Sequence, residues 1–142
     1  MPWGLQIGRM IAGGKYRYAE SDPESDPYWY VKQRAEGPVY LQKLIKTTMT
    51  KDLFEKVSIP TFVGYYYKDE ENQDNTVRVD KILWMFDNLG TDEGLKKAVA
   101  FPEAGSHVIA SSLTSGSWED VLRETIEFSE ETLRLKPIYQ TN

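Results

Sequence analysis

In the C-terminal part of the chain, segments with a strand-like pattern of apolar residues alternate with segments that have apolar residues at helical spacing. Residues 60–67 are β-forming, aromatic and uncharged, as expected for a strand covered on both faces. Residues 77–89 carry apolar side chains at helical spacing and precede Gly90, a typical helix stop. A short apolar run, residues 98–101, predicts a second strand. Residues 58–136 therefore predict a β-α-β-α unit with parallel strands and a right-handed crossover.

The boundaries of the last two elements follow from turn and cap residues. Thr91 is expected to cap one further turn before the strand at 98–101. Ser117 and Asp120 form a near capping box, which predicts a helix from Ser117 that Pro137 ends. Two parallel strands make a poor sheet by themselves, so further strands are expected from elsewhere.

The first 57 residues follow a mixed, mainly helical pattern. A short helix is predicted over residues 3–12, and the glycine pair at 13–14 ends it. Residues 28–47 predict one helix, or two broken at residues 37–38, and Thr50 is a good N-cap for a short helix over 51–57. The chain is therefore divided into a helical segment, 1–57, and an α/β segment, 58–142.

Composition narrows the classes of function. A chain of 142 residues fits one domain, and its net charge of −5 argues against a nucleic-acid partner. The chain lacks cysteine and has one histidine, so we expect neither a metal site nor a cofactor. No apolar stretch approaches the roughly 18 residues of a membrane span, and no secretory signal is evident. We therefore expect no membrane partner and, by default, a cytoplasmic location.

The candidate chemistry lies in the two loops that follow the predicted strands. His107, the only histidine, follows the second strand, and an acidic loop, residues 68–74, follows the first. A carboxylate and then a histidine at neighbouring strand ends are two members of a nucleophilic triad in chain order. The loop offers Asp69, Glu70, Glu71 and Asp74 as the acid, and Asp74 and Asp69 are the leading candidates. The alternatives without a catalytic role are a loop histidine bonded to a backbone carbonyl and an acidic loop that is simply solvated.

The third member of such a triad has no clear candidate in the sequence. No Gly-x-Ser-x-Gly elbow occurs, and no nearby serine lies in a strand–turn–helix between glycines (Ser106, Ser111, Ser112, Ser115 and Ser117). The tyrosines at 65–67 favour a core role, with at least one ring expected on the substrate side of the strand end.

Residues 58–136 resemble the C-terminal end of an α/β-hydrolase. The run SIPTFV at 58–63 is similar to the family's entry into its acid-bearing strand, and GSH at 105–107 is similar to its histidine turn. The helix from Ser117 resembles its terminal helix, and residues 1–57 would correspond to its cap. The resemblance implies that His107 is the catalytic base. It favours Asp74 as the acid, because Val77 follows three residues later, with Asp69 as the alternate.

The resemblance implies a partial α/β-hydrolase fold and two hypotheses about function. In the first, the chain is a fragment of an esterase- or lipase-like serine hydrolase that supplies Asp74 and His107 but not the nucleophile. It would be inactive alone and act on a small-molecule ester when a missing N-terminal half completes it. In the second, it is a non-enzymatic α/β module that forms a homodimer through its open sheet edge. A third hypothesis, ranked below these two, is that Asp74 and His107 carry out a reaction that needs no nucleophile.

Overall fold

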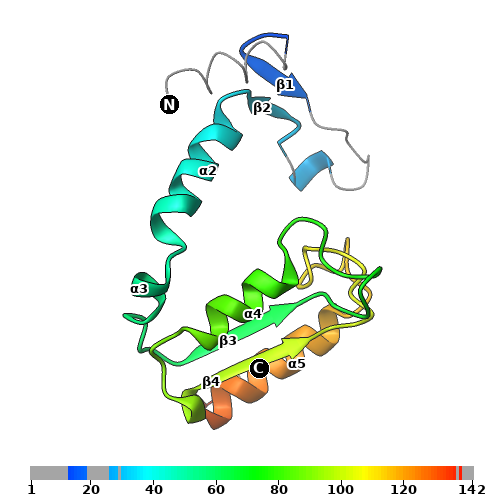
Figure 1. Cartoon of the computed structure of the whole chain (residues 1–142). Helices are drawn as coiled ribbons and strands as arrows, with labels where there is room; N and C mark the ends of the chain where they lie inside the picture. Colours follow the sequence, from blue (N-terminus) through cyan, green and yellow to red (C-terminus); the bar gives the residue numbers. More distant parts are fainter. Residues whose placement is uncertain (1–12, 19–25, 29, 137, 139–142) are drawn as a thin grey trace. The chain divides into compact units, whose positions relative to one another are not determined.

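The computed structural model describes residues 13–18, 26–28, 30–136 and 138. The chain forms two compact units, Met1–Thr50 and Lys51–Asn142 (Figure 1). The sequence-based boundary between residues 57 and 58 falls inside the second unit. The helix predicted over residues 3–12 lies outside the described residues.

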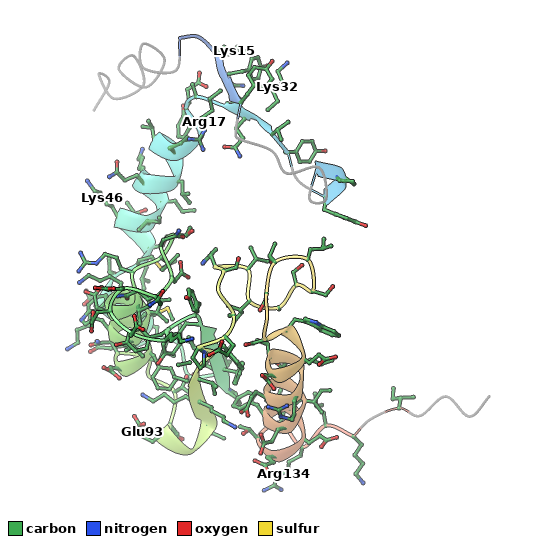
Figure 2. All side chains as sticks on the ribbon, turned by 90° about the vertical axis from the view of Figure 1, so that its right-hand side faces the viewer. Lys15, Arg17, Lys32, Lys46, Glu93 and Arg134 are labelled. Carbon is green, nitrogen blue, oxygen red and sulfur yellow. The ribbon has the colours of Figure 1, made fainter. Side chains whose placement is uncertain are left out.

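The first unit contains a small antiparallel hairpin and one helix. Strand β1 (Tyr16–Tyr18) pairs with β2 (Lys32–Arg34), the 3-10 helix η1 (Asp26–Tyr28) lies between them in sequence, and α2 (Gly37–Thr48) follows. The hairpin is held by side chains as well as backbone: Arg17 donates to Gln33 Oε1 at 2.6 Å, and Lys32 Nζ lies 4.5 Å from the centre of the Tyr16 ring. Figure 2 labels Arg17 and Lys32 on these two strands.

The prediction of helix was wrong for the described part of residues 28–36, whereas the helical prediction for the following segment is confirmed. Residues 32–34 are a strand because β1 offers them backbone partners, a pairing that helical periodicity does not reveal. The helix begins at the predicted break, with Pro38 in its first turn. Proline is tolerated there because the N–H groups of the first turn have no partner within the helix.

The second unit has the predicted order of strands and helices. It contains α3 (Lys51–Phe54), β3 (Thr61–Tyr65), α4 (Val79–Asp87), the 3-10 helix η2 (Glu93–Leu95), β4 (Lys96–Ala100) and α5 (Trp118–Glu131). Strands β3 and β4 are parallel, with Thr61 opposite Lys96 and Tyr65 opposite Ala100. Figure 1 shows both arrows ending at the edge where the loops leading to α4 and α5 begin.

Helices α4 and α5 pack on opposite faces of this sheet. Lys97 pairs with Glu124 of α5 at 2.9 Å, whereas Lys96 points toward α4 and approaches the carbonyl oxygen of Phe86 at 3.4 Å. Successive side chains of a strand point to opposite faces, so the two lysines identify the two helix-covered sides.

The packed core cluster lies on the α5 side of the sheet and is small, and other buried apolar residues of this unit lie outside it (Phe54, Val79, Leu89 and Phe128). Phe101, Ala104 and Val121 are buried, and four partly buried residues pack against them (Phe62, Tyr66, Val99 and Ile109). Every residue of β3 and β4 is only partly buried. Parallel strands are usually covered completely on both faces, so this sheet is less enclosed than is typical.

The predicted helix stop at Gly90 and the predicted cap at Thr91 were wrong. Helix α4 ends at Asp87 and is capped by Asn88, so Gly90 is not its stop. A Cβ atom on Gly90 would lie 2.1 Å from the carbonyl oxygen of Glu55, so the glycine permits a close approach of two chain segments. Thr91 caps no helix: its buried hydroxyl donates to the carbonyl oxygen of Ile59 at 2.8 Å and also bonds the Val57 carbonyl.

Helix α5 begins where the sequence predicts, with Ser117 at its N-cap position, but the predicted capping bond and the predicted end were wrong. The Ser117 side chain makes no capping bond, and its own N–H donates to Ser115 Oγ at 3.1 Å. The helix ends at Glu131, before Pro137 is reached, and Arg134 follows in the left-handed region with φ of 54°. Local turn contacts decide both ends, and the sequence pattern does not contain them.

Within the described part of the chain, the helices are all too short or too polar to cross a bilayer.

The close approach at Gly90 generates a prediction about stability. Gly90→Ala should lower the free energy of unfolding by about 1–3 kcal/mol, because the added methyl group would overlap a backbone oxygen that cannot rotate away. Gly94→Ala is the matched control, since nothing lies within 4 Å of its Cβ position. Chemical denaturation of the full chain measures both. Equal midpoints for the two variants would contradict this account of Gly90.

Candidate functional site

Asp74 is held at the carboxyl end of β3 by a loop that turns back on the strand. Its backbone N–H donates to the Tyr66 carbonyl oxygen at 3.1 Å, and an antiparallel bridge joins Tyr67 and Gln73. Its Oδ1 accepts the N–H groups of Thr76 at 2.8 Å and Val77 at 2.9 Å. The side chain is only 3% exposed. This Asx-type turn fixes the carboxylate and leaves Oδ2 for another partner.

His107 lies in the loop that follows β4. Gly105 precedes it with φ of 67°, a conformation that suits glycine. Two bonds shape the turn: Val108 N–H donates to Ser106 Oγ at 3.2 Å, and Ile109 N–H donates to the His107 carbonyl oxygen at 3.1 Å. The imidazole is 44% exposed, so it can reach a second molecule.

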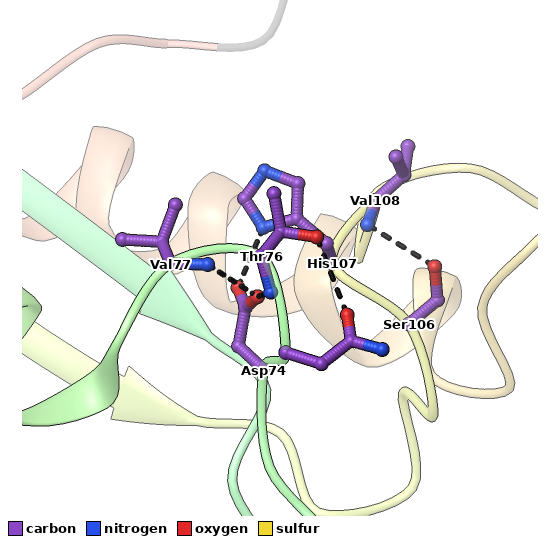
Figure 3. A network of polar contacts seen from close by, with 7 residues as sticks. Asp74, Thr76, Val77, Ser106, His107 and Val108 are labelled. Carbon is purple, nitrogen blue, oxygen red and sulfur yellow. Dashed lines mark hydrogen bonds and ion pairs between the residues drawn. The ribbon is translucent and has the colours of Figure 1, made fainter. Parts of the chain in front are cut away.

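The two predicted site residues are in direct contact. His107 Nδ1 lies 2.5 Å from Asp74 Oδ2, although 33 positions separate them in the chain (Figure 3). The contact forms because parallel strands bring their carboxyl ends to the same edge of the sheet. His107 is therefore bonded to a carboxylate and not to a backbone carbonyl, which was the alternative without a catalytic role.

The bonds to Asp74 keep its carboxyl group ionised. Burial raises the pKa of this group, but the His107 hydrogen bond and the N–H groups of Val77 and Thr76 outweigh burial and leave the pKa below its usual value. An ionised carboxylate only accepts, so Nδ1 of the ring must carry the proton and donate it. In the neutral ring the lone pair is then on Nε2.

Asp69, the alternate acid, bonds within its own loop. Its Oδ1 accepts the N–H groups of Asn72 at 2.8 Å and Glu71 at 3.0 Å, and its carboxylate also accepts from the Asn72 amide. The Asn72 side-chain bond is the main cause that lowers the pKa of Asp69. The geometry thus assigns Asp74, not Asp69, to the histidine.

An open cleft of about 800 Å³ lies beside Asp74. Tyr65 and Tyr67 line it, together with residues of the acidic loop and of the start of α4 (Glu70, Gln73, Asp74, Asn75, Arg78, Val79, Asp80 and Leu83). Tyr66 instead packs against the core. Tyr65 and Tyr67 thus lie on the opposite side of the strand from Tyr66, as alternation along a strand requires.

Three of the described serines near His107 stabilise local turns. Ser106, Ser111 and Ser115 each accept a backbone N–H from two residues further along the chain. Among the described residues, no hydrogen bond engages Nε2 of His107, and none of these serines lies on it. No described group of three or more acidic or histidine side chains is arranged to hold a metal ion.

Sequence reasoning missed two supports of the site. The N–H groups of Thr76 and Val77 carry no side-chain signal, so only the folded loop reveals them. Lys68 pairs with Glu103 at 3.1 Å and links the acidic loop to the histidine loop a second time. The sequence does place a lysine after one strand and a glutamate after the other, but the charged residues of these loops could pair in several other ways.

No protein-family model matches this chain, and no curated protein matches it. The interpretation of the site therefore depends on its geometry and on general chemistry.

The buried carboxylate leads to a prediction about pH. Its folded-state pKa is lowered, so ionised Asp74 stabilises the fold above its unfolded pKa of about 4, and this stabilisation is lost as the pH falls through the folded pKa. Asp74→Asn should cost about 1–3 kcal/mol at pH 5, and the difference from the native chain should shrink toward about pH 2. Denaturation as a function of pH measures this. Asp92→Asn, at an exposed site, is the control, and a pH-independent difference for Asp74→Asn would contradict the assignment.

Proposed function

We propose that the second unit supplies the acid–histidine part of a serine-hydrolase site of the α/β-hydrolase type. The observation that supports this is the 2.5 Å contact between His107 Nδ1 and a buried, doubly N–H-bonded Asp74. The parallel order of β3 and β4, each followed by a loop that bears one of the two residues, agrees with the same reading. The substrate class is a carboxylic ester, and the nucleophile comes from another segment or polypeptide.

In this mechanism each residue has one task. Asp74 accepts the Nδ1 proton, fixes the tautomer and stabilises the imidazolium that forms during reaction. His107 Nε2 takes the proton of an incoming serine hydroxyl as the serine attacks the ester carbonyl, and then returns it to the departing alcohol. Asp74 stays ionised throughout, which its lowered pKa favours.

Two features support an external source for the nucleophile. The sequence contains no Gly-x-Ser-x-Gly elbow, and the side chains of Ser106, Ser111 and Ser115 accept local backbone bonds. The partly exposed strands offer an edge on which a further strand can pair, which would also increase coverage of the sheet. The same added segment would have to supply the donors for the developing oxyanion.

A second candidate function is a non-enzymatic module that associates with its own copy. Helix α5 carries exposed apolar side chains at Trp118, Leu122 and Ile126, with Leu122 51% and Ile126 48% exposed. These positions are four residues apart and form one stripe on the helix. A homodimer would remove this stripe, or an open sheet edge, from water.

The hydrolase proposal predicts a dependence on both residues in the native assembly. A fluorophosphonate probe should label a serine in a segment that co-purifies with this chain, and that assembly should hydrolyse alkyl esters. His107→Gln and Asp74→Asn should each lower kcat by about 10³-fold or more, because the base is lost or misoriented. Asp69→Asn is the control and should change the rate little. An assembly whose hydrolysis is unaffected by His107→Gln would overturn the proposal.

The second candidate predicts the solution mass of the purified chain. Sedimentation equilibrium at micromolar concentration should give about twice the 16.4 kDa of one chain. Replacing Leu122 and Ile126 together by Glu should return the mass to that of the monomer, whereas Glu119→Gln on the same helix should not. A monomer for the native chain would exclude this candidate.

A further inference from the structure

We propose that His107 is itself a nucleophile toward activated acyl esters, so that this chain hydrolyses aryl esters without any serine. The catalytic atom is Nε2, and the substrates are esters whose leaving group is a phenolate of low basicity. The inference does not rest on the proposed serine-hydrolase function. It needs only the geometry of the Asp74–His107 pair.

The pair leaves a defined lone pair facing outward. The buried carboxylate of Asp74 takes the Nδ1 proton, so the neutral ring presents an unprotonated Nε2. Figure 3 shows Nδ1 directed at Asp74 and the other ring nitrogen directed away from it. With 44% of the imidazole exposed and no described hydrogen bond on Nε2, an acyl carbon can approach this atom.

Asp74 also favours the charged intermediate of the reaction. When Nε2 bonds to an acyl carbon, the ring becomes an acylimidazolium, and its positive charge lies against a carboxylate at 2.5 Å. A carboxylate held by two backbone N–H groups does not have to reorganise as this charge develops. An ordinary exposed histidine lacks such a partner, so the Asp74–His107 pair should react faster than a free histidine side chain.

The reaction has two balanced steps. In the first, Nε2 attacks the ester carbonyl, the Nε2–C bond forms, and the C–O bond breaks with its electron pair leaving on the aryloxide. In the second, water adds to the acyl carbon, the C–Nε2 bond breaks, and the electron pair returns to Nε2. The neutral ring with its Nδ1 proton is restored. The carboxylate forms and two protons pass to solvent, one balancing the charge of the carboxylate and the other that of the aryloxide.

The requirement for an activated ester follows from the chemistry of the leaving group. An alkoxide is a far poorer leaving group than imidazole, so attack on an alkyl ester would simply reverse. Activity of the isolated chain should therefore be confined to aryl esters, in contrast to the alkyl-ester activity proposed for a serine-containing assembly.

The test is the hydrolysis of 4-nitrophenyl acetate by the purified full chain near neutral pH. The chain should turn over repeatedly, at least about tenfold faster than the same concentration of Nα-acetylhistidine amide. His107→Gln should abolish turnover and leave only the slow, stoichiometric acylation of lysines. The glutamine side chain keeps an N–H group that can donate to Asp74 Oδ2. Circular dichroism checks that the variant stays folded.

Two further variants and one trapping experiment complete the test. Asp74→Asn should lower the turnover about tenfold or more, whereas Asp69→Asn should leave it unchanged. Acid quenching followed by peptide mass spectrometry should find the acetyl group on His107 during turnover. Turnover that survives His107→Gln, or a native rate no higher than that of Nα-acetylhistidine amide, would overturn the proposal.

The outcome is independent of the serine-hydrolase proposal. A fluorophosphonate should not inhibit the isolated chain, since no serine takes part. Aryl-ester turnover that a fluorophosphonate abolishes would assign the reaction to a serine and overturn the histidine mechanism. Failure to find a labelled serine in the native assembly would overturn only the proposal of the previous section.

Discussion

The hydrogen bond between Asp74 and His107 is the interaction around which the second unit is arranged. It joins the loops that follow the two parallel strands, and it places a buried carboxylate against a partly exposed imidazole. The carboxylate can stay ionised there because the His107 bond and two backbone N–H groups stabilise it. Without these bonds, burial alone would favour the protonated acid.

This pair is supported by a scaffold that is only partly enclosed. The core cluster of the second unit centres on three buried residues on one face of the sheet. Both strands of the sheet are only partly buried. Gly64 contributes to the packing, because a Cβ there would come within 2.9 Å of Ile109 Cδ1. The fold thus combines a well-defined polar site with a sheet that retains capacity for further pairing. Both proposed functions, the acid–histidine part of a hydrolase and the self-associating module, depend on a sheet that can accept a further partner.

The electrostatics of the site also separate two kinds of chemistry. A serine mechanism uses Nε2 as a base and requires a hydroxyl and oxyanion donors from outside the described residues. A histidine mechanism uses the same lone pair as a nucleophile and requires only a good leaving group. Both depend on the orientation that Asp74 imposes, which is why the geometry of one hydrogen bond carries so much of the functional argument.

The sequence by itself determined the order of strands and helices in residues 58–136, since periods of 2 and 3.6 are local properties. It also placed His107 and the acidic loop at neighbouring strand ends. Only the tertiary structure decided between Asp74 and Asp69, because the choice depends on how the loop folds back on β3. The same reason explains the errors at residues 28–36, at Gly90 and at Thr91. Each of these depends on a partner distant in sequence, and such contacts leave no mark on a local pattern.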